Sequence, residues 1–415
     1  MKSFDVMVLG AGMAGVSVAH ALVERGRAVL LVDRQEAGEG TSYGNAGVIE
    51  TDGFTPVTFP DDWRSLMRYA LNRESEVHYH MKTLVRMAPW LAALRRYSQP
   101  DALVRYAEVM KPLILAAGTA HDHLAQQAGA TGFYRETGWI KLFRDPGSRK
   151  YAEAMMREAD AAGTHCTEIS KEAMADLEPH LRPDYHTALY FRGSRSVSSP
   201  GGVTKAIAQS VVAKGGTFLT GDAATLAEET DGGWSVQTSD GPCRAADVVV
   251  ALGPWAKTLV ARFGYQLPLE VKRGYHRHFV PSGNAGLSRP VVDMDNGFVI
   301  TPMERGIRLT SGIEFAELDS APTPVQMGRI LPMARALFPL EDPVEDEPWM
   351  GNRPCTPDSM PVLGRAPNHA GLWFSIGHGH WGFSLGPITG RLVAQAIVGE
   401  TPDHPIDALS AARFG

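Results

Sequence analysis

Short apolar runs and one helical pattern alternate over the first 33 residues. Val6-Met7-Val8-Leu9 is a continuous apolar run of the kind that forms a strand buried on both faces. A glycine-rich turn and a helical stretch follow, and a second apolar run, "AVLLVD", ends at Asp33. The pattern predicts strand, tight turn, helix and strand, which together make one βαβ unit.

The turn of this unit has the spacing of a dinucleotide-binding motif. Gly10-Ala11-Gly12-Met13-Ala14-Gly15 reads G-x-G-x-x-G at the junction of strand and helix. Gly10 permits the turn, Gly12 lets a pyrophosphate approach the backbone, and Gly15 allows close packing of helix on strand. The N-terminus of the helix offers N–H groups to phosphate, and Asp33 is placed to accept a hydrogen bond from an adenosine ribose. The segment therefore predicts that a dinucleotide binds here.

The rest of the chain extends this unit and interrupts it. Residues 199–230 are typical of a helix followed by a strand, and residues 233–256 of a hairpin with an apolar second strand. Mostly helical patterns precede residue 199, and after residue 256 strands alternate with turns such as Asp295-Asn296-Gly297 and Glu304-Arg305-Gly306. We expect an α/β protein (α+β overall) in which an antiparallel sheet with helices is inserted into a discontinuous Rossmann-type domain. The expected Rossmann-type domain comprises residues 1–58, 196–258 and 345–415, and the substrate-binding domain comprises residues 59–195 and 259–344.

Two helices of the inserted part carry specific expectations. Residues 323–339 predict a helix that Pro332 breaks. Residues 83–97 mix apolar and basic residues with Trp90, as interfacial helices do. This second helix packs on the protein's own core or lies on a membrane surface, and the pattern favours the core.

Composition narrows the class of protein. A net charge of -6 argues against a general nucleic-acid binder, which needs a basic face. The three cysteines form no CxxC, which excludes a zinc ribbon or thioredoxin-like site and is typical of a reducing compartment; they are Cys166, Cys243 and Cys355. No apolar run reaches the roughly 18 to 20 residues of a membrane span, and no secretory signal pattern precedes the first strand. We expect a cytoplasmic protein, with peripheral contact to the inner face of the cell membrane as the alternative.

The segment after Asp33 favours FAD over NAD. Residues 38–53, "GEGTSYGNAGVIETDG", are rich in glycine and small polar residues and lack the pattern of a third strand–helix unit. Such a loop offers backbone and hydroxyl donors that could follow a long cofactor from its pyrophosphate towards a flavin ring. Later, Gly221-Asp222-Ala223 could pass beneath an adenine, and the strand at 248–251 ends in small residues, as at a ligand site.

Six motifs in this order make the chain similar to a known family. They are G-x-G-x-x-G, Thr41-Ser42-x-x-Asn45-Ala46-Gly47, Ala251-x-Gly253-x-Trp255, "RGYH" (273–276), "GNRPCTPDSMPVLG" (351–364) and "GHGHWGFSLGPITG" (377–390). The chain resembles the D-amino-acid oxidase-like FAD oxidoreductases over nearly its whole length, and most closely the bacterial D-amino-acid dehydrogenases. It departs from many relatives at Leu252, where they have Thr, and at Asp33, where they have Glu.

The resemblance implies noncovalent FAD and assigns residues along it. Its ADP half would be held by Gly10, Gly12, Ala14, Gly15, Asp33 and Arg34, with Ala223, Ala224, Ala251, Gly253 and Trp255 nearby. The path to the flavin would follow Thr41, Ser42, Asn45, Ala46 and Gly47, and the flavin ring would lie against Gly351, Gly377, His378, Gly379, His380, Trp381 and Gly382. The helix after the last of these loops is expected to start near Gly386, with its dipole towards the reduced flavin.

Oxidation of an amino acid needs a cation for the substrate carboxylate. Arginine makes two parallel hydrogen bonds to a carboxylate and is favoured over lysine. We assign this role to Arg353, where the resemblance also places it; pairing with Asp358 is the structural alternative. In the strand 271–279, Tyr275 either donates to the carboxylate or walls the pocket, and His276 either lines it or faces solvent. Arg305 and Arg308 are expected to be solvated, and no general base is assigned.

The favoured function is oxidation of a D-amino acid or a cyclic imino acid, such as a D-proline derivative, by hydride transfer from the α carbon to flavin N5. Electrons would pass to a membrane quinone or another acceptor. The alternatives are an amino-acid or glycine-type oxidase that uses O2 and an FAD-holding subunit of a multi-subunit amine dehydrogenase. The substrate side chain, its chirality and the oligomeric state stay open.

The histidine pair His378 and His380 has two interpretations. Residues i and i+2 of a strand share a face, so the pair could be half of a metal site. No Cys, Asp or Glu lies within "GHGHWGFSLGP", however, and its glycines suit backbone access to a ligand. We therefore expect no metal and a loop at the flavin ring, with His380 rather than His378 facing the substrate.

Overall fold

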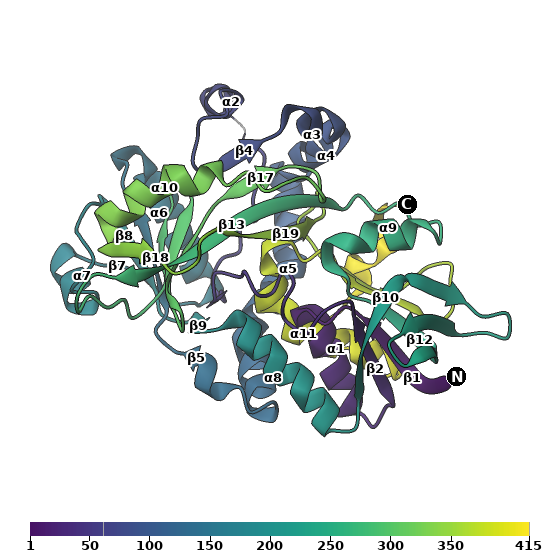
Figure 1. Ribbon diagram of the computed structural model, residues 1–415. Coiled ribbons are helices and arrows are strands. Elements are labelled where there is room, and N and C mark those ends of the chain that lie inside the picture. Colours follow the sequence, from purple (N-terminus) through teal and green to yellow (C-terminus); the bar gives the residue numbers. More distant parts are fainter. Residues whose placement is uncertain (61, 415) are drawn as a thin grey trace.

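The structure is a computed structural model that describes residues 1–60 and 62–414 (Figure 1). The predicted βαβ unit forms the centre of its first sheet. β1 (Lys2–Leu9) pairs in parallel with β2 (Val29–Asp33) on one side and with β12 (Gly241–Val250) on the other. The remaining strands of this sheet are β10 (Thr217–Glu228), β11 (Trp234–Thr238), β20 (Val362–Arg365) and β21 (Leu372–Ile376).

The carboxyl ends of the parallel strands meet at one edge of this sheet. Leu9 stands opposite Val32 and Val250, so the turn after β1, Asp33 and Ala251 lie side by side. In open α/β sheets ligands bind at this edge. The predicted hairpin is also present, because β11 pairs antiparallel with the first half of β12.

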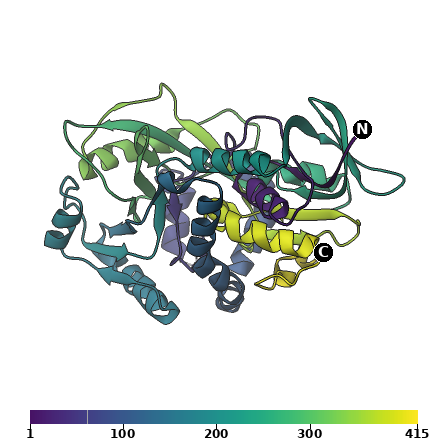
Figure 2. The ribbon, with the colours of Figure 1, turned by 90° about the horizontal axis from the view of Figure 1, so that it is seen from below.

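Apolar residues cover both faces of the first sheet. Val6 and Val8 point into one core and Met7 and Leu9 into the other, as the alternation of a strand requires. Figure 2 shows the helices of the first face side by side; they are α1 (Met13–Val23), α5 (Pro100–Gln127), α8 (Pro200–Ala213) and α11 (Gly382–Ile397). The short helix α9 (Ala256–Ala261) packs into the core of the second face.

Helix α11 begins at Gly382, so the expected start near Gly386 was wrong. Pro387 lies inside the helix and has no N–H to donate to the carbonyl of Phe383. That carbonyl instead accepts a hydrogen bond from Nε2 of His121 at 3.0 Å. A side chain from α5 thus satisfies the backbone group that proline leaves free, and the helix continues.

A larger sheet lies beside the first (Figure 1). Its long central strand β13 (Glu270–Pro281) pairs with β16 (Gly306–Thr310), β17 (Ile313–Phe315), β18 (Leu340–Pro343) and β19 (Trp349–Cys355). The other strands are β4 (Val77–Tyr79), β6 (Trp139–Phe143), β7 (Cys166–Glu168), β8 (Thr187–Phe191), β14 (Val291–Asp293) and β15 (Phe298–Met303). A small third sheet joins β3 (Val48–Ile49), β5 (Tyr134–Arg135) and β9 (Arg195–Val197).

The larger sheet differs from the expectation in two respects. It is mixed rather than antiparallel, because β4 pairs in parallel with β17 and β6 with β14. In addition, β19 pairs with β13, although residues 345–415 were assigned to the Rossmann-type domain. An apolar pattern identifies a strand but not its partner, which explains both differences. The division into domains otherwise stays a prediction.

The helices around this sheet are α2 (Trp63–Ala70), α3 (Met81–Arg86), α4 (Ala88–Tyr97), α6 (Arg149–Ala162), α7 (Lys171–Leu177) and α10 (Val325–Leu337). Pro332 does not break α10; it is exposed, so water can reach the carbonyl that it leaves without a donor. The helix expected at 83–97 is divided at Met87, and Trp90 is buried beside Cys355. Of the helices that the structure describes, none has both the length and the apolar character needed to cross a membrane.

Candidate active site

A cavity of about 600 Å³ lies at the carboxyl edge of the first sheet and reaches the larger sheet. Its lining comes from the turn after β1, the loops after β2 and β12, the loop before α11, and strands β13 and β19. Two regions of the chain that are far apart in sequence, 38–53 and 349–355, therefore face the same space.

The glycine-rich turn forms one end of the cavity. Gly10 has a φ of +107°, and a Cβ there would lie 2.4 Å from the carbonyl oxygen of Ala251. A Cβ at Gly15 would lie 1.8 Å from the carbonyl oxygen of Gly10, so Gly15 allows helix and strand to pack closely. Gly12 and Ala14, at the start of α1, line the cavity, where the helix N-terminus offers N–H groups without an intrahelical partner.

Asp33 and Arg34 lie beside this turn. One carboxylate oxygen of Asp33 accepts a hydrogen bond from the N–H of Ala11 at 2.7 Å, which fixes the side chain at the strand end. The guanidinium of Arg34 lies over the ring of Trp255, 4.1 Å from its centre. Both residues line the cavity together with Ala223, Ala224, Ala251 and Gly253.

The loop 41–47 is held against the larger sheet by three side chains. Thr41 donates to the carbonyl of Asn352 at 2.9 Å, and Thr301 donates to the carbonyl of Ala46 at 2.9 Å. Arg308 donates to the carbonyls of Tyr43 at 2.9 Å and Asn45 at 2.6 Å.

The expectation that Arg308 is solvated was therefore wrong, whereas Arg305 is exposed. Burial lowers the pKa of Arg308 to about 10. The loop 41–47 covers the face of β16 on which Arg308 lies, and the alternation within one strand cannot reveal such a cover.

Arg353 lies on β19 with its guanidinium against Gly274 of β13. A Cβ at Gly274 would lie 2.5 Å from Nη2 and 2.7 Å from Nη1 of Arg353, so glycine is needed for this packing. Arg353 lines the cavity and donates to the carbonyl of Gly312 at 3.2 Å. Among the described residues no carboxylate pairs with it, since Asp358 pairs with Arg413 at 2.8 Å. Burial lowers the pKa of Arg353. The cavity thus contains a cation without an anion of its own.

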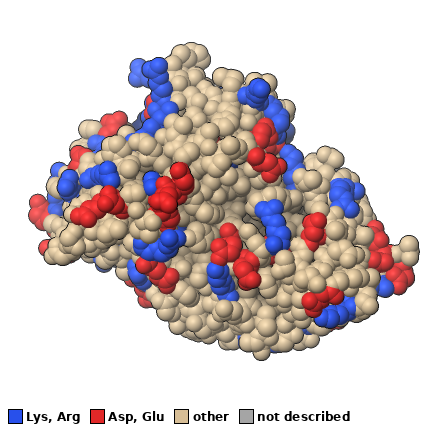
Figure 3. Space-filling view, viewed as in Figure 1, with Lys and Arg blue, Asp and Glu red and all other residues tan. Residues whose placement is uncertain are grey.

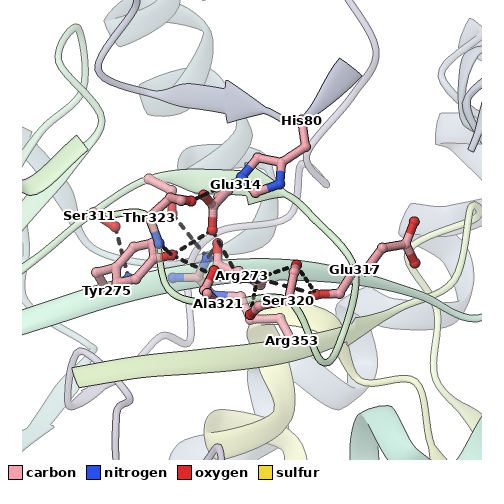
Figure 4. A network of polar contacts seen from close by, with 11 residues as sticks. His80, Arg273, Tyr275, Ser311, Glu314, Glu317, Ser320, Ala321, Thr323 and Arg353 are labelled. Atoms are coloured by element: carbon pink, nitrogen blue, oxygen red, sulfur yellow. Dashed lines mark hydrogen bonds and ion pairs between the residues drawn. The ribbon is translucent and has the colours of Figure 1, made fainter. Parts of the chain in front are cut away.

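The hydroxyl of Tyr275 is engaged within the protein (Figure 4). It donates to Oε2 of Glu314 at 2.6 Å and accepts hydrogen bonds from Arg273 and the N–H of Thr323, both at 2.9 Å. The hydroxyl proton is therefore donated to Glu314 and is not available to a substrate carboxylate. Tyr275 lines the cavity, which leaves the second of its two expected roles, that of a wall.

The same network fixes the segment 317–323 at the rim of the cavity. Arg273 is fully buried, pairs with Glu314 at 2.9 Å and donates to the carbonyls of Glu317, Ser320 and Ala321. Leu318 and Asp319, within this segment, line the cavity. His78, His80 and Glu314 lie close enough to share a cation, but both oxygens of Glu314 already have partners in Tyr275 and Thr323.

The three histidines of interest lie in different environments. His276 is buried behind Trp349, with ring centres 4.9 Å apart, and Trp349 rather than His276 lines the cavity. Burial lowers the pKa of His276. His378 and His380 both line the cavity; His378 is buried, with Nε2 3.0 Å from Oγ1 of Thr389, whereas the side chain of His380 is open to the cavity. Enclosure and the charges of Lys272, Arg353 and Lys141 lower the pKa of His380.

A group of charged residues that the sequence reading missed forms another wall. Glu50 lines the cavity, and its Oε1 lies 3.1 Å from Nζ of Lys141. Behind them, Asp52 accepts hydrogen bonds from Ser194 at 2.9 Å and from Trp139 at 3.3 Å. Burial and the charge of Glu50 raise the pKa of Asp52 to about 6. The signal was a lysine in the middle of the apolar strand "WIKLF", because a buried lysine needs a partner.

Most of the residues that sequence reasoning assigned to the cofactor line this one cavity. They are Gly10, Gly12, Ala14, Asp33, Arg34, Thr41, Ser42, Asn45, Ala46, Ala223, Ala224, Ala251, Gly253, Trp255, Gly351, His378, Gly379, His380, Trp381 and Gly382. Gly15, Gly47 and Gly377 lie outside the lining and act through the backbone. Gly47, for example, has a φ of +75°, and a Cβ there would lie 2.6 Å from Met303.

The residues present fit a dinucleotide with a flavin. The glycine turn gives backbone access at one end, and a loop that contains three glycines, 377–382, gives it at the other. Between them, Oγ of Ser375 and Oγ1 of Thr310 are buried at the cavity wall and have no hydrogen-bond partner among the described residues. Such groups need a partner, which a polar ligand would supply.

Known proteins resemble this chain over its whole length. It is 28% identical over 416 residues to a D-amino-acid oxidase of Bradyrhizobium diazoefficiens, covering 99% of this chain and 98% of the relative. It is 27% identical over 427 residues to a D-amino acid dehydrogenase of Chromohalobacter salexigens, with 99% of each chain covered. Glycine oxidase from Geobacillus kaustophilus has the same fold, with a TM-score of 0.78, 23% identity and coverage of 100% of this chain and 99% of that one.

A family model agrees with these similarities. The model described as FAD dependent oxidoreductase (DAO) matches residues 5–396. The expected fold class and FAD as the cofactor are thereby confirmed. The chain belongs to the DAO family of FAD-dependent oxidoreductases.

Proposed function

We propose that this protein oxidises an α-amino acid to the corresponding product with a C=N bond. The substrate is either a D-amino acid or a cyclic imino acid, whose amine is part of a ring as in a D-proline derivative. The observation that carries the proposal is Arg353, a cavity-lining cation that no carboxylate of the described residues neutralises. A buried cation of this kind calls for an anionic ligand, and a planar guanidinium matches a carboxylate in geometry. When bound, FAD supplies the hydride acceptor, its N5 atom.

Different side chains of the cavity bind different groups of the substrate. Arg353 binds the carboxylate, and the rings of Tyr275 and Trp349 form apolar walls. Glu50 presents a carboxylate to the cavity and suits the substrate amine. His380 has a lowered pKa, is uncharged at neutral pH and lines the same space. Carboxylate and amine would thus be held by charges of opposite sign.

The names of relatives support the D configuration and leave the electron acceptor open. One relative is named D-amino-acid oxidase and several are named D-amino acid dehydrogenase. We favour transfer of electrons to a quinone or another acceptor; an oxidase that uses O2 is the second candidate because of the first of these relatives. Noncovalent attachment of FAD stays a prediction.

Anaerobic reduction by a panel of D- and L-amino acids, including cyclic ones, tests the proposal. We expect bleaching of the flavin absorption by D-amino acids or cyclic imino acids. Protein that retains FAD but is reduced by no amino acid would contradict the proposal and favour a subunit that requires a partner. Reoxidation of the reduced protein with air and with a quinone analogue then separates the two acceptors. Rapid formation of H2O2 would show that the protein uses O2 as its electron acceptor and is an oxidase.

A further inference from the structure

Large apolar side chains are exposed together on helices α2 and α3. Trp63 is 73% exposed, Leu71 65% and Met67 48%, and on α3 Met81 is 63% and Val85 69% exposed. We call these five residues the α2–α3 surface. Single exposed apolar residues are ordinary in folded proteins, but several large ones repeated along one face of a helix mark an interaction site.

The spacing of these residues places them on one side of each helix. Trp63, Met67 and Leu71 follow one another at intervals of four along α2 and its C-terminal cap, and Met81 and Val85 have the same interval on α3. No residue of α2 is buried. Figure 1 shows α2, α3 and α4 together at one end of the molecule, beyond the larger sheet. The helix α2 thus presents an apolar face to solvent without a core of its own.

The segment that carries this apolar surface is rich in basic residues. Residues 62–97 contain seven Lys or Arg and three Asp or Glu, in a chain whose net charge is -6. Asp62 caps α2, and both glutamates, Glu74 and Glu76, pair with Arg68. Several exposed cations of the segment have no ion-pair partner among the described residues; they are Arg64, Arg73, Lys82, Arg95 and Arg96. Figure 3 shows blue basic atoms on both sides of the tan surface at this end.

We propose that the α2–α3 surface binds an anionic lipid bilayer, with its apolar side chains inserted at the boundary of headgroups and acyl chains. Amphipathic helices with Trp or Leu on one face and Lys or Arg around it bind membranes in this way. A second copy of this chain is the other candidate occupant. A symmetric dimer would place the same patch against itself and bring the unpaired cations together, which disfavours it. The proposal does not depend on the substrate or on the proposed function.

Co-sedimentation of the FAD-loaded protein with vesicles tests the proposal. The vesicles contain phosphatidylcholine alone or with about one third phosphatidylglycerol. We expect binding to the anionic vesicles, weak binding to the neutral ones, and loss of binding in high salt. The triple variant W63S/M67S/L71S should lose binding. The variant R64Q/K82Q/R96Q should bind anionic vesicles about fivefold more weakly for each cation removed.

A matched control removes exposed apolar residues from elsewhere. Val212 and Val280 are 48% and 45% exposed and lie outside α2 and α3, so V212S/V280S should bind like the wild type. FAD absorption and circular dichroism verify that each variant is folded. Wild-type protein that fails to bind, or a triple variant that binds as well as the wild type, overturns the proposal. Sedimentation velocity measures the oligomeric state of the wild type and of the triple variant. If the wild type is a dimer that does not bind vesicles and the triple variant is a monomer, the surface binds a second copy and the proposal is overturned.

Discussion

Replacing Gly274 by alanine tests whether the position of Arg353 determines substrate binding. The added Cβ would lie 2.5 Å from Nη2, 2.7 Å from Nη1 and 2.8 Å from Cζ of Arg353. Gly274 does not have a positive φ, so alanine is compatible with the backbone of β13. The substitution therefore acts on the guanidinium rather than on the strand.

The size of the effect follows from these distances. Non-bonded heavy atoms pack at about 3.5 Å, so the guanidinium has to withdraw by about 1 Å. A displacement of about 1 Å in a substrate-positioning group costs about 100-fold in rate. The side chain is flexible and can move at little cost to the fold, and we expect the free energy of unfolding to change by less than about 1 kcal/mol.

The assay compares binding with stability. A carboxylate ligand without an amine is titrated into the FAD-loaded protein, and Kd is obtained from the change in the flavin spectrum. The kcat/KM for the best amino acid is measured in parallel. We expect a fall of about 100-fold in kcat/KM, a weaker Kd and unchanged FAD content. Gly328→Ala is the matched control, because a Cβ there has no neighbour within 4 Å. A folded Gly274→Ala variant that binds the carboxylate as tightly as the wild type would refute the reasoning.

Four further substitutions test other parts of the site. Arg353→Lys keeps the charge but loses the two parallel hydrogen bonds, so kcat/KM should fall about 100-fold with FAD retained; an unchanged value removes Arg353 from the substrate site. Glu50→Gln should raise KM for the amino acid about tenfold and leave Kd for the amine-free carboxylate unchanged, whereas equal effects on both ligands would contradict an amine-binding role. Arg308→Met leaves the carbonyls of Tyr43 and Asn45 without their donor, and Kd for FAD, measured by fluorescence titration, should rise about tenfold. The pKa of Asp52 is about 6 in the folded protein and 3.8 for the free group, so the folded state binds the proton more tightly. The free energy of unfolding therefore falls by about 3 kcal/mol as the pH rises from about 4 to about 6. Denaturant titrations of Asp52→Asn should lack that slope, and a variant that keeps it assigns the slope to another group.

The parts of the fold that are local in sequence could be predicted. The turn at Gly10, the helix after it and the hairpin at 234–250 follow from spacing and alternation alone. Pro387 shows the limit of such rules. Its effect on α11 depends on His121, which lies more than 260 positions earlier and supplies the missing donor. A proline rule therefore predicts a local cost, while the tertiary structure decides whether the helix ends.

The candidate site divides in the same way. At the dinucleotide end, the glycine turn and Asp33 lie in one continuous segment, so they could be assigned from the motif. The substrate end depends on the pairing of β13 with β19 and of β6 with β14, which no local pattern specifies. This explains why Tyr275 could be placed near the pocket while the engagement of its hydroxyl by Glu314 could not be foreseen.

Lys141 shows that a charged residue in an apolar strand predicts a partner of opposite charge. A lysine within "WIKLF" that is only 6% exposed requires a counter-charge, so the sequence signals that a partner exists but not which one. The structure supplies Glu50, 91 positions away, and places it at the cavity wall. Because the larger sheet contributes Arg353, Tyr275 and Lys141, substitutions in its strands should change substrate preference, whereas substitutions in the glycine turn should change FAD binding. Separate measurement of Kd for FAD and of KM across an amino-acid panel distinguishes the two groups of variants.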